Sequence, residues 1–231
     1  MNLESRTLSQ LLEHHNEISK MLENGENVDS IYLDFSKTFD KSDIGILLHK
    51  LRKLGVTGRL WRWISNFLSK RKQKVVVNGI TSSVTNVTSG IPQGTVLRPI
   101  LFQIYISDRG EHVKALKQIY VNDTNIKKGI KTEDDVEDIQ EDLEELYKRA
   151  KENNMVFNQS KFQVIKYGTN EILKGDTNYF TDDNSEITES FESLRDLGVI
   201  LSDDATFEKH VENVVNIARQ KNWLGPQHFL F

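Results

Sequence analysis

Three polar residues, far apart in the chain, carry the chemistry that this sequence suggests. Asp34 lies near the end of a β-branched and aromatic segment that starts at Val28, and Asn122 and Asp123 lie between two short apolar segments. Nucleotidyl transfer uses two divalent cations about 3.5–4 Å apart, and magnesium prefers carboxylate oxygens. Carboxylates from separate strands that meet at one sheet edge would hold such ions. Taken alone, Asn-Asp is also typical of an ordinary polar hairpin turn, because both residues tolerate left-handed backbone.

Three further features would assist this chemistry. The loop Ser89–Gly94 contains glycines that permit close backbone approach to a template base or an incoming nucleotide. An aromatic ring at Phe39, shortly after Asp34, would press against a sugar and exclude a 2′-hydroxyl. Lys161 would act as a general acid toward pyrophosphate. Each feature has an ordinary alternative: a Gly-Pro turn, a core phenylalanine and a surface lysine.

Composition restricts the class of protein. The 231 residues suffice for one large domain or two small ones, and 37% hydrophobic content with a mean hydropathy of −0.50 is not polar enough for disorder. No run of about 20 apolar residues predicts a membrane span, so no membrane partner is expected. The chain has no cysteine and therefore no disulfide partner, which favours an intracellular protein of the nucleus or cytoplasm.

Charge is segregated along the chain. The net charge is −4 and the pI is about 5.9, whereas nucleic-acid enzymes are more often basic. Residues 41–79 hold ten Lys or Arg and one acid, and residues 133–145 hold nine acids and no base. The acidic run predicts a solvated helix face, and the basic segment predicts a nucleic-acid contact. The residues expected to make this contact are Lys70, Arg71, Lys72 and Lys74.

The periodicity of apolar residues predicts both helices and strands. The expected helices span 8–22, 46–54, 58–70, 93–107, 132–150 and 206–218, and the expected strands span 28–35, 74–79, 83–88, 116–121, 125–130, 162–167 and 192–201. Their order lacks the regular unit of a parallel sheet, so we expect an α+β fold with an antiparallel sheet and helices packed on one face. The polar stretch 169–189 is the expected boundary between domains.

Together these segments resemble the reverse transcriptase domain of non-LTR (LINE-type) retrotransposons over nearly the whole chain. The resemblance rests on five motifs in order. They are Asp34–Asp40, the first catalytic motif; 89–99, the template-and-nucleotide motif; Tyr120-Val121-Asn122-Asp123, the acidic turn; 158–168, the fourth motif; and Leu197-Gly198-Val199, the primer-grip hairpin.

The resemblance implies a right-hand polymerase palm that copies an RNA template from a DNA primer, with deoxynucleoside triphosphates as substrates. It implies two Mg²⁺ or Mn²⁺ ions held by Asp34 and Asp123, with Lys161 as proton donor. The implied nucleotide-binding residues are Phe35, Phe39, Pro92, Gln93 and Gly94, and the implied primer grip is Leu197, Gly198 and Val199. The implied domains are 1–27, a remnant of the fingers and palm entry; 28–168, the palm; and 169–231, the primer-grip hairpin and the start of the thumb.

One departure from the family pattern affects the chemistry directly. Asn122 stands where the family has its second metal-binding Asp, and the short region before Asp34 implies partial fingers. An amide oxygen neutralises none of a cation's charge, so we expect weakened metal binding and turnover lower by at least two to three decades, at ~1.4 kcal/mol per decade. The sequence therefore predicts a truncated, strongly impaired reverse transcriptase. The alternatives are a non-catalytic nucleic-acid-binding remnant and a decayed fragment without selected function; the oligomeric state stays open.

Overall fold

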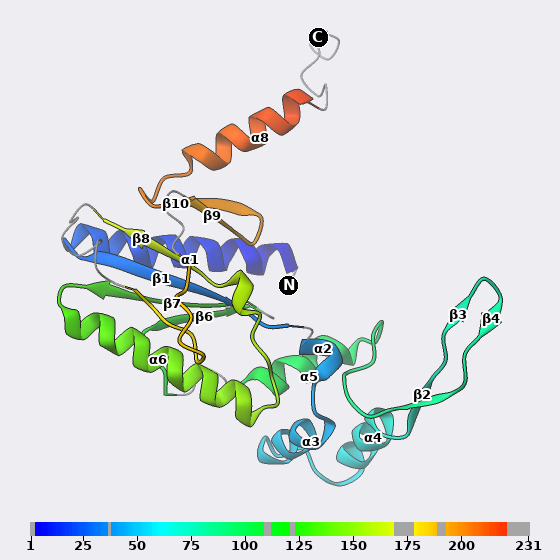
Figure 1. Ribbon diagram of the computed structural model, residues 1–231. Coiled ribbons are helices and arrows are strands. Elements are labelled where there is room, and N and C mark those ends of the chain that lie inside the picture. Colours follow the sequence, from blue (N-terminus) through cyan, green and yellow to red (C-terminus); the bar gives the residue numbers. More distant parts are fainter. Residues whose placement is uncertain are drawn as a thin grey trace. The chain divides into compact units, whose positions relative to one another are not determined.

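The computed structural model describes residues 3–36, 38–108, 112–120, 123–168, 178–188 and 193–220 (Figure 1). Within these ranges, the side chains of residues 3–8, 38, 39, 118–120 and 123 lie outside the description. Among the described helices, none is both long and apolar enough to cross a membrane.

Each helix and strand that the periodicity predicts has a counterpart among the described residues, most with shifted ends. The strand expected over 74–79 is reduced to Val76–Val77, and the short elements at 38–41, 71–73, 80–81 and 159–161 were not predicted. The helices are α1 (Leu3–Glu23), α2 (Thr38–Lys41), α3 (Ile44–Lys53), α4 (Gly58–Leu68), α5 (Leu97–Ile106), α6 (Glu133–Glu152), the short 3-10 helix η1 (Gln159–Lys161) and α8 (Glu208–Gln220). The strands are β1 (Asn27–Asp34), β2 (Arg71–Gln73), β3 (Val76–Val77), β4 (Ile80–Thr81), β5 (Thr85–Val87), β6 (Leu116–Tyr120), β7 (Asp123–Ile130), β8 (Gln163–Tyr167), β9 (Ser193–Asp196) and β10 (Val199–Ser202).

Backbone conformation explains where one predicted helix begins and how one predicted strand region turns. The helix expected from residue 93 begins at Leu97, because Gly94 adopts a left-handed φ of +73° in the preceding turn. The strand region expected over 192–201 forms the hairpin that the resemblance implies at residues 197–199, because Leu197 and Gly198 have φ values of 47° and 90°. Positive φ at both central residues is the geometry of the type I′ turn, which matches the twist of the flanking strands.

The main sheet has four strands in the order β6-β7-β1-β8. Strands β1 and β8 are antiparallel, from Val28 opposite Tyr167 to Tyr32 opposite Gln163. Strand β7 also runs antiparallel to β1. The side-chain amide of Asn125, near the start of β7, donates to Ser30 Oγ at 2.7 Å and to the carbonyl of Ile31 at 3.2 Å. Just past the other end of β7, Lys131 pairs with Glu26 at 2.8 Å. The predicted antiparallel sheet is therefore confirmed.

The chain divides into two compact units. The first unit comprises Met1–Tyr32, Asn125–Gln140 and Phe162–Phe231, and the second comprises Leu33–Thr124 and Glu141–Lys161. Strands β1 and β7 and helix α6 contribute residues to both. The sequence predicts a different division, by function, into a fingers remnant, a palm and the start of a thumb. That division stays a prediction.

In the first unit, α1 packs on the sheet through Ile18. This residue belongs to a buried cluster with Val28, Ile165, Tyr167, Leu194 and Leu201. On β7, Lys127 pairs with Glu17 of α1 at 2.7 Å, whereas the next residue, Lys128, pairs with Asp135 of α6 at 2.9 Å. Successive side chains of a strand point to opposite faces. Helices therefore contact both faces here, which differs from the expectation of one covered face.

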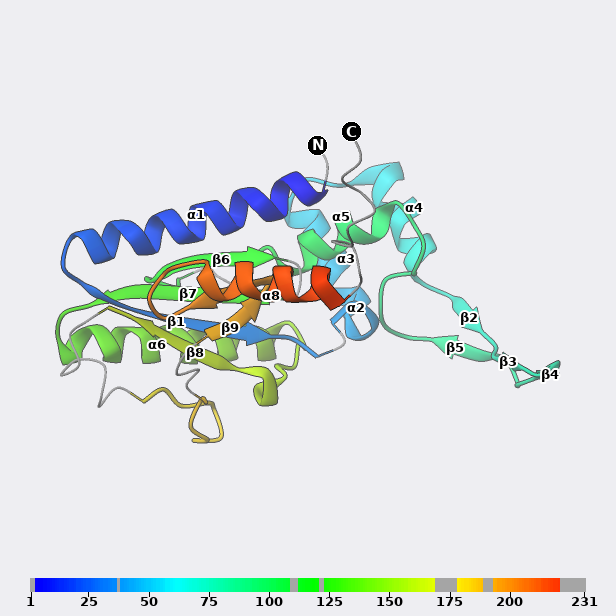
Figure 2. The same cartoon turned by 90° about the horizontal axis from the view of Figure 1, so that it is seen from above.

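The second unit is built on α3, which packs against α4 and α5. Its core includes Leu47 and Leu51 of α3, Leu68 of α4, and Leu101 and Phe102 of α5, all nearly fully buried. From α4 the chain leaves as an extended hairpin in which β2 pairs with β5 and β3 pairs with β4 near the tip. In both views this hairpin extends away from α4 and α5 (Figures 1 and 2).

Candidate active site

The structure brings the end of β1 and the start of β7 to the same edge of the sheet. Asp34 is the last residue of β1, and Asp123 is the first residue of the neighbouring strand β7. Because β7 is antiparallel to β1 and Asn125 bonds Ile31, the backbone of Asp123 starts beside the final residues of β1. The side chain of Asp123 and the whole of Asn122 lie outside the described residues. The backbone arrangement is the one that a shared carboxylate site requires.

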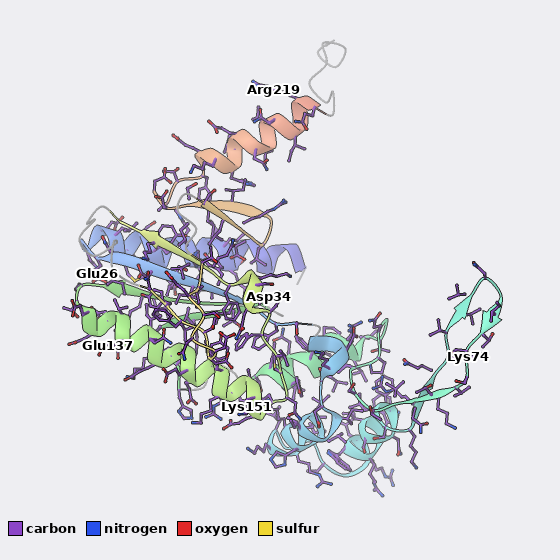
Figure 3. The ribbon with its side chains drawn as sticks, in the orientation of Figure 1. Glu26, Asp34, Lys74, Glu137, Lys151 and Arg219 are labelled. Atoms are coloured by element: carbon purple, nitrogen blue, oxygen red, sulfur yellow. The ribbon has the colours of Figure 1, made fainter. Side chains whose placement is uncertain are left out.

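Lys161 meets Asp34 directly. Its Nζ atom lies 2.9 Å from Oδ2 of Asp34. The Asn158 N–H donates to the Asp34 carbonyl at 2.8 Å, and the ring of Phe157 stacks on Phe35 with centroids 4.0 Å apart. The segment that enters η1 therefore runs along the end of β1, marked by Asp34 in Figure 3, and holds the predicted proton donor against the predicted metal ligand.

The oxygen donors at this edge of the sheet are of the type that binds a hard divalent cation, but they carry little negative charge. Among the described residues, no group of three or more His, Cys, Asp or Glu is arranged to hold a metal ion. Asp34 offers carboxylate oxygens, the ligand type that Mg²⁺ prefers, but its single charge is shared with the Lys161 ammonium. Asp123 would add a second carboxylate and Asn122 only an amide, so the set fits such an ion while compensating its charge poorly.

The loop Ser89–Gly94 packs against the segment that follows Asp34. The Gly90 N–H donates to the carbonyl of Ser42 at 2.8 Å, and Gln93 Nε2 donates to Asp40 Oδ1 at 3.3 Å. Gly90 has a φ of +77°, and a Cβ atom there would lie 2.7 Å from the Asp40 carbonyl oxygen. Only glycine allows this approach. The first and second predicted motifs are thus adjacent, with Pro92 half-buried and Gly94 exposed.

Arg71 holds this loop in place. Its Nε donates to the carbonyl of Leu68 at 2.8 Å, and its Nη2 donates to the carbonyls of Ser89, at 2.9 Å, and Gly90. A planar guanidinium presents several donors in a fixed geometry, which suits this bridging role. The sequence carried no signal that separates Arg71 from the lysines around it. Those lysines, 70, 72 and 74, are exposed, and nucleic-acid contact stays a prediction for them and for Arg71.

The other predicted site residues lie directly after β1, in α2 and in the β9–β10 hairpin. The Phe35 ring is buried against Phe157, so a nucleotide contact from Phe35 would have to come from its backbone. Phe39 lies in α2, and its side chain is outside the description. Leu197 and Gly198 form the turn of the β9–β10 hairpin, and Val199 begins β10. The predicted hairpin is present, and its contact with a primer stays a prediction.

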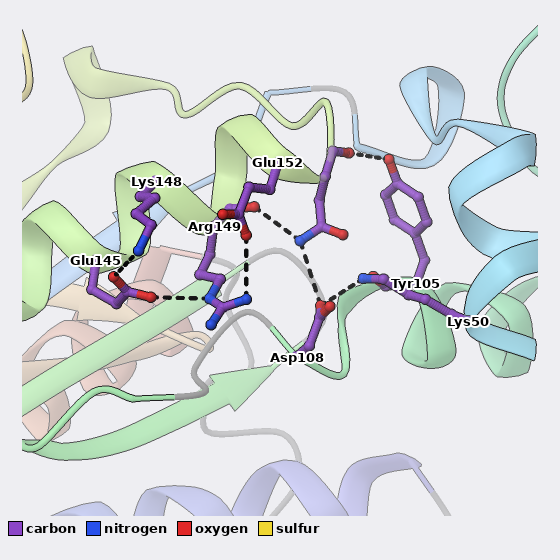
Figure 4. Close-up of polar contacts among 8 residues, drawn as sticks. Lys50, Tyr105, Asp108, Glu145, Lys148, Arg149 and Glu152 are labelled. Atoms are coloured by element: carbon purple, nitrogen blue, oxygen red, sulfur yellow. Dashed lines mark hydrogen bonds and ion pairs between the residues drawn. The ribbon is translucent and has the colours of Figure 1, made fainter. Parts of the chain in front are cut away.

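A polar network that the sequence did not reveal ties together the parts of the second unit. Tyr105 of α5 accepts the Asp43 N–H at 3.1 Å through its hydroxyl oxygen and donates to the Asn153 carbonyl. Buried Lys50 donates to the Tyr105 carbonyl and to Asp108 (Figure 4). Burial lowers the pKa of Lys50, and Asp108 opposes that shift. The network anchors α3, α5 and the end of α6 beside the segment that carries the Gly90 loop.

Solved structures show the class of fold. The chain is similar to apo telomerase from Candida tropicalis truncated from its C-terminal domain, with a TM-score of 0.57, 12% identity, and coverage of 87% of this chain and 38% of that one. It is also similar to telomerase from Candida albicans in complex with a TWJ fragment of telomeric RNA, with a TM-score of 0.57, 11% identity, and coverage of 97% and 39%. The α+β fold with a polymerase palm is therefore confirmed.

Sequence comparison shows the family. Residues 4–222 match the reverse transcriptase (RNA-dependent DNA polymerase) family, and the chain belongs to that family. It is 29% identical over 216 residues to the RNA-directed DNA polymerase from mobile element jockey of Drosophila funebris, covering 88% of this chain and 23% of that protein. It is 26% identical over 98 residues to the Pol polyprotein of the type-1 retrotransposable element R2 of Popillia japonica, covering 42% and 16%.

These relatives confirm the resemblance to non-LTR retrotransposons. The family generally uses divalent metal ions. The chain spans about a quarter of the length of the jockey proteins that it matches.

Proposed function

We propose that this chain is the polymerase core of an RNA-directed DNA polymerase, extending a DNA primer on an RNA template with deoxynucleoside triphosphates. One observation carries the proposal: Asp34 ends β1 where Asp123 begins the adjacent antiparallel strand. Membership of the reverse transcriptase family supports it.

In this proposal each residue has a definite task. Asp34 and Asp123 supply the oxygen ligands for two Mg²⁺ or Mn²⁺ ions, which when bound would activate the primer hydroxyl and stabilise the leaving phosphates. Lys161 keeps an ammonium group at the same site, where it would give a proton to pyrophosphate. Gln93, whose side-chain amide donates to Asp40, and Gly94 line the nucleotide, and Phe39 excludes a 2′-hydroxyl from the sugar site.

We further propose that Asn122 makes this copy slow. Two dications bring four positive charges, and Asp34 and Asp123 supply two negative ones, of which one is shared with Lys161. Metal stabilisation contributes several kcal/mol in such sites, and about 1.4 kcal/mol corresponds to a factor of ten in rate. The loss of one carboxylate at position 122 would therefore lower turnover by at least two to three decades.

Primer extension tests the proposal. Magnesium-dependent extension on an RNA template is measured for the wild-type chain, for Asn122→Asp and for Asn184→Asp, a matched control that adds the same charge at an exposed turn of the first unit. We expect Asn122→Asp to be at least about 100-fold faster than the wild type, and Asn184→Asp to leave the rate unchanged. Equal and robust rates in wild type and Asn122→Asp would refute the impairment. A folded Asn122→Asp protein without any extension would refute the polymerase proposal.

A second candidate function is nucleic-acid binding without catalysis. It is favoured by residues 44–107, which contain ten Lys or Arg and no Asp or Glu. Binding of this kind weakens steeply with salt and does not require metal ions. A chain that binds no nucleic acid at low ionic strength would exclude this function. If that chain also lacked a cooperative thermal unfolding transition, the result would favour the third alternative, a decayed fragment without selected function.

A further inference from the structure

Two tryptophans of α4, two positions apart, have different environments. The Trp61 indole donates through Nε1 to the Leu48 carbonyl at 3.1 Å, and the Arg52 guanidinium lies over its ring at 4.0 Å. Trp63 is 54% exposed, and its ring lies nearly parallel to that of Phe67, with centroids 5.9 Å apart and an interplanar angle of 12°. Trp61 therefore anchors α4 to α3, whereas Trp63 presents a large aromatic surface to solvent on a ring that Phe67 supports.

Positive charge surrounds this exposed ring. Arg59 lies one turn before Trp63 on the same helix face, and Arg62 precedes it directly; both are exposed. Neither arginine takes part in an ion pair with another described residue, and the stretch 44–107 offers no carboxylate to either. The exposed lysines 70, 72 and 74, of which Lys74 is marked on the hairpin in Figure 3, extend the charge beyond the end of α4.

We propose that this outer face of α4, made of Arg59, Arg62, Trp63 and Phe67, binds an unpaired nucleic-acid strand. A base stacks on Trp63, and the adjoining phosphates lie against the two arginines. Aromatic side chains for base stacking beside cations for the backbone are the combination by which proteins hold single strands. The inference deepens the nucleic-acid-binding function proposed above and rests on it.

Charge complementarity selects this occupant over a protein segment. An exposed aromatic face that packed on another protein would be matched by apolar side chains. Arg59 and Arg62, which form no ion pair with a described residue, would require carboxylates opposite them. A nucleic-acid strand supplies both partners, because its phosphates are negatively charged and its bases are aromatic. An unpaired strand does so better than a duplex, because the faces of duplex bases are already covered by their neighbours.

Fluorescence anisotropy with end-labelled single strands tests the proposal. Oligo(dT) and oligo(rU) of about 12 nucleotides are titrated with the protein in EDTA, so that metal binding and catalysis do not enter. Trp63→Leu removes the aromatic surface and keeps an apolar side chain, and Trp63→Phe keeps a ring. Trp61→Phe is the matched control, because that indole already has its partners within the chain.

We expect Trp63→Leu to weaken binding roughly tenfold and Trp63→Phe to weaken it less than about threefold, since one base stack is lost only in the first. We expect Trp61→Phe to bind as the wild type does once its melting shows that it is folded. The double variant Arg59→Gln, Arg62→Gln would bind more weakly and with a flatter dependence on salt. The DNA and RNA arms decide which strand the face prefers.

Each contrary result has its own meaning. Salt-sensitive binding by the wild type that is unchanged in Trp63→Leu overturns this site and leaves the proposed binding function intact. No binding by the wild type at low salt refutes both. A wild-type dimer that Trp63→Leu converts to a monomer, with strand binding unchanged, assigns the face to a second copy of the chain and overturns the proposal.

Discussion

The ammonium nitrogen of Lys161 lies 2.9 Å from the carboxylate of Asp34, although a large part of the chain separates the two residues. The Lys161 side chain is 64% exposed and that of Asp34 is 20% exposed, so the pair lies at the surface of the sheet edge. A cation that approaches Asp34 there meets a positive charge already in place. This relationship leads to the first prediction.

Lys161→Met should tighten the binding of Mn²⁺ or Mg²⁺ about threefold to tenfold, because the competing ammonium group is gone while Asp34 keeps its charge. Its effect on the free energy of unfolding should stay below about 1 kcal/mol, as is usual for an exposed pair. Isothermal titration at low ionic strength measures the affinity. Lys148→Met, which removes an exposed lysine paired with Glu145, is the control. Unchanged or weaker metal binding in Lys161→Met contradicts the expectation.

Arg71→Lys should lower the free energy of unfolding by about 1–3 kcal/mol, because lysine cannot bridge the three carbonyls of Leu68, Ser89 and Gly90 that the guanidinium reaches. Lys72→Gln, which changes the exposed neighbour, should alter stability by less than about 0.5 kcal/mol. Urea unfolding curves of both variants measure the difference. If Arg71→Lys is as stable as the wild type, the hydrogen bonds of Arg71 do not hold the loop.

Asp108→Ala should cost about 2 kcal/mol, because it leaves the buried Lys50 ammonium with the Tyr105 carbonyl and no carboxylate. The pKa of Lys50 should fall further, since Asp108 is the group that raises it against burial. Glu141→Ala breaks a pair with Lys114 whose side chains are 66% and 62% exposed, and should cost less than about 0.5 kcal/mol. Thermal melts measure both changes; similar losses in the two variants would argue against a special role for the buried pair.

His14 of α1 is buried beside a buried cation. Its Nδ1 lies 3.0 Å from Lys127 Nζ, and its Nε2 lies 2.9 Å from the Tyr32 hydroxyl. Burial, followed by the charges of Lys127 and His15, lowers the pKa of His14 to about 3. Burial also lowers the pKa of Lys127, which Glu17 opposes. A neutral His14 accepts from Lys127 at Nδ1, so Nε2 carries the hydrogen that it donates to Tyr32.

Stability should therefore fall as the solution becomes acidic. Below about pH 6.5 the unfolded chain binds a proton on His14, whereas the folded chain binds none until about pH 3. The contribution is thus complete above about pH 6.5 and is lost between that value and pH 3, with a slope of up to ~1.4 kcal/mol per pH unit. Urea unfolding across this range measures the slope. His14→Gln should flatten it, and His49→Gln, at an exposed position of α3, should not; parallel curves for wild type and His14→Gln would refute the account.

Much of the fold can be predicted from local sequence pattern, but most hydrogen-bond and ion-pair partners of the polar side chains cannot. Apolar spacing and β-branched runs correctly predicted the longer elements, their order and the position of Asp34 at a strand end, because period and propensity act within a few residues. The same pattern could not tell Trp61 from Trp63, or Arg71 from the lysines beside it. Those differences arise when separate loops and helices meet, since the carbonyls of Leu48, Ser89 and Gly90 become acceptors only in the folded chain.

The sequence by itself determined the family, the order of the motifs and the presence of an amide, not a carboxylate, at position 122, because these are facts of residue type and spacing. Only the tertiary structure decided that Lys161 faces Asp34, that Gly90 lies against Asp40, and that Trp63 of α4 stays exposed. Contacts between distant segments depend on backbone geometry summed over many residues, and one residue of shift in a strand turns a side chain to the opposite face.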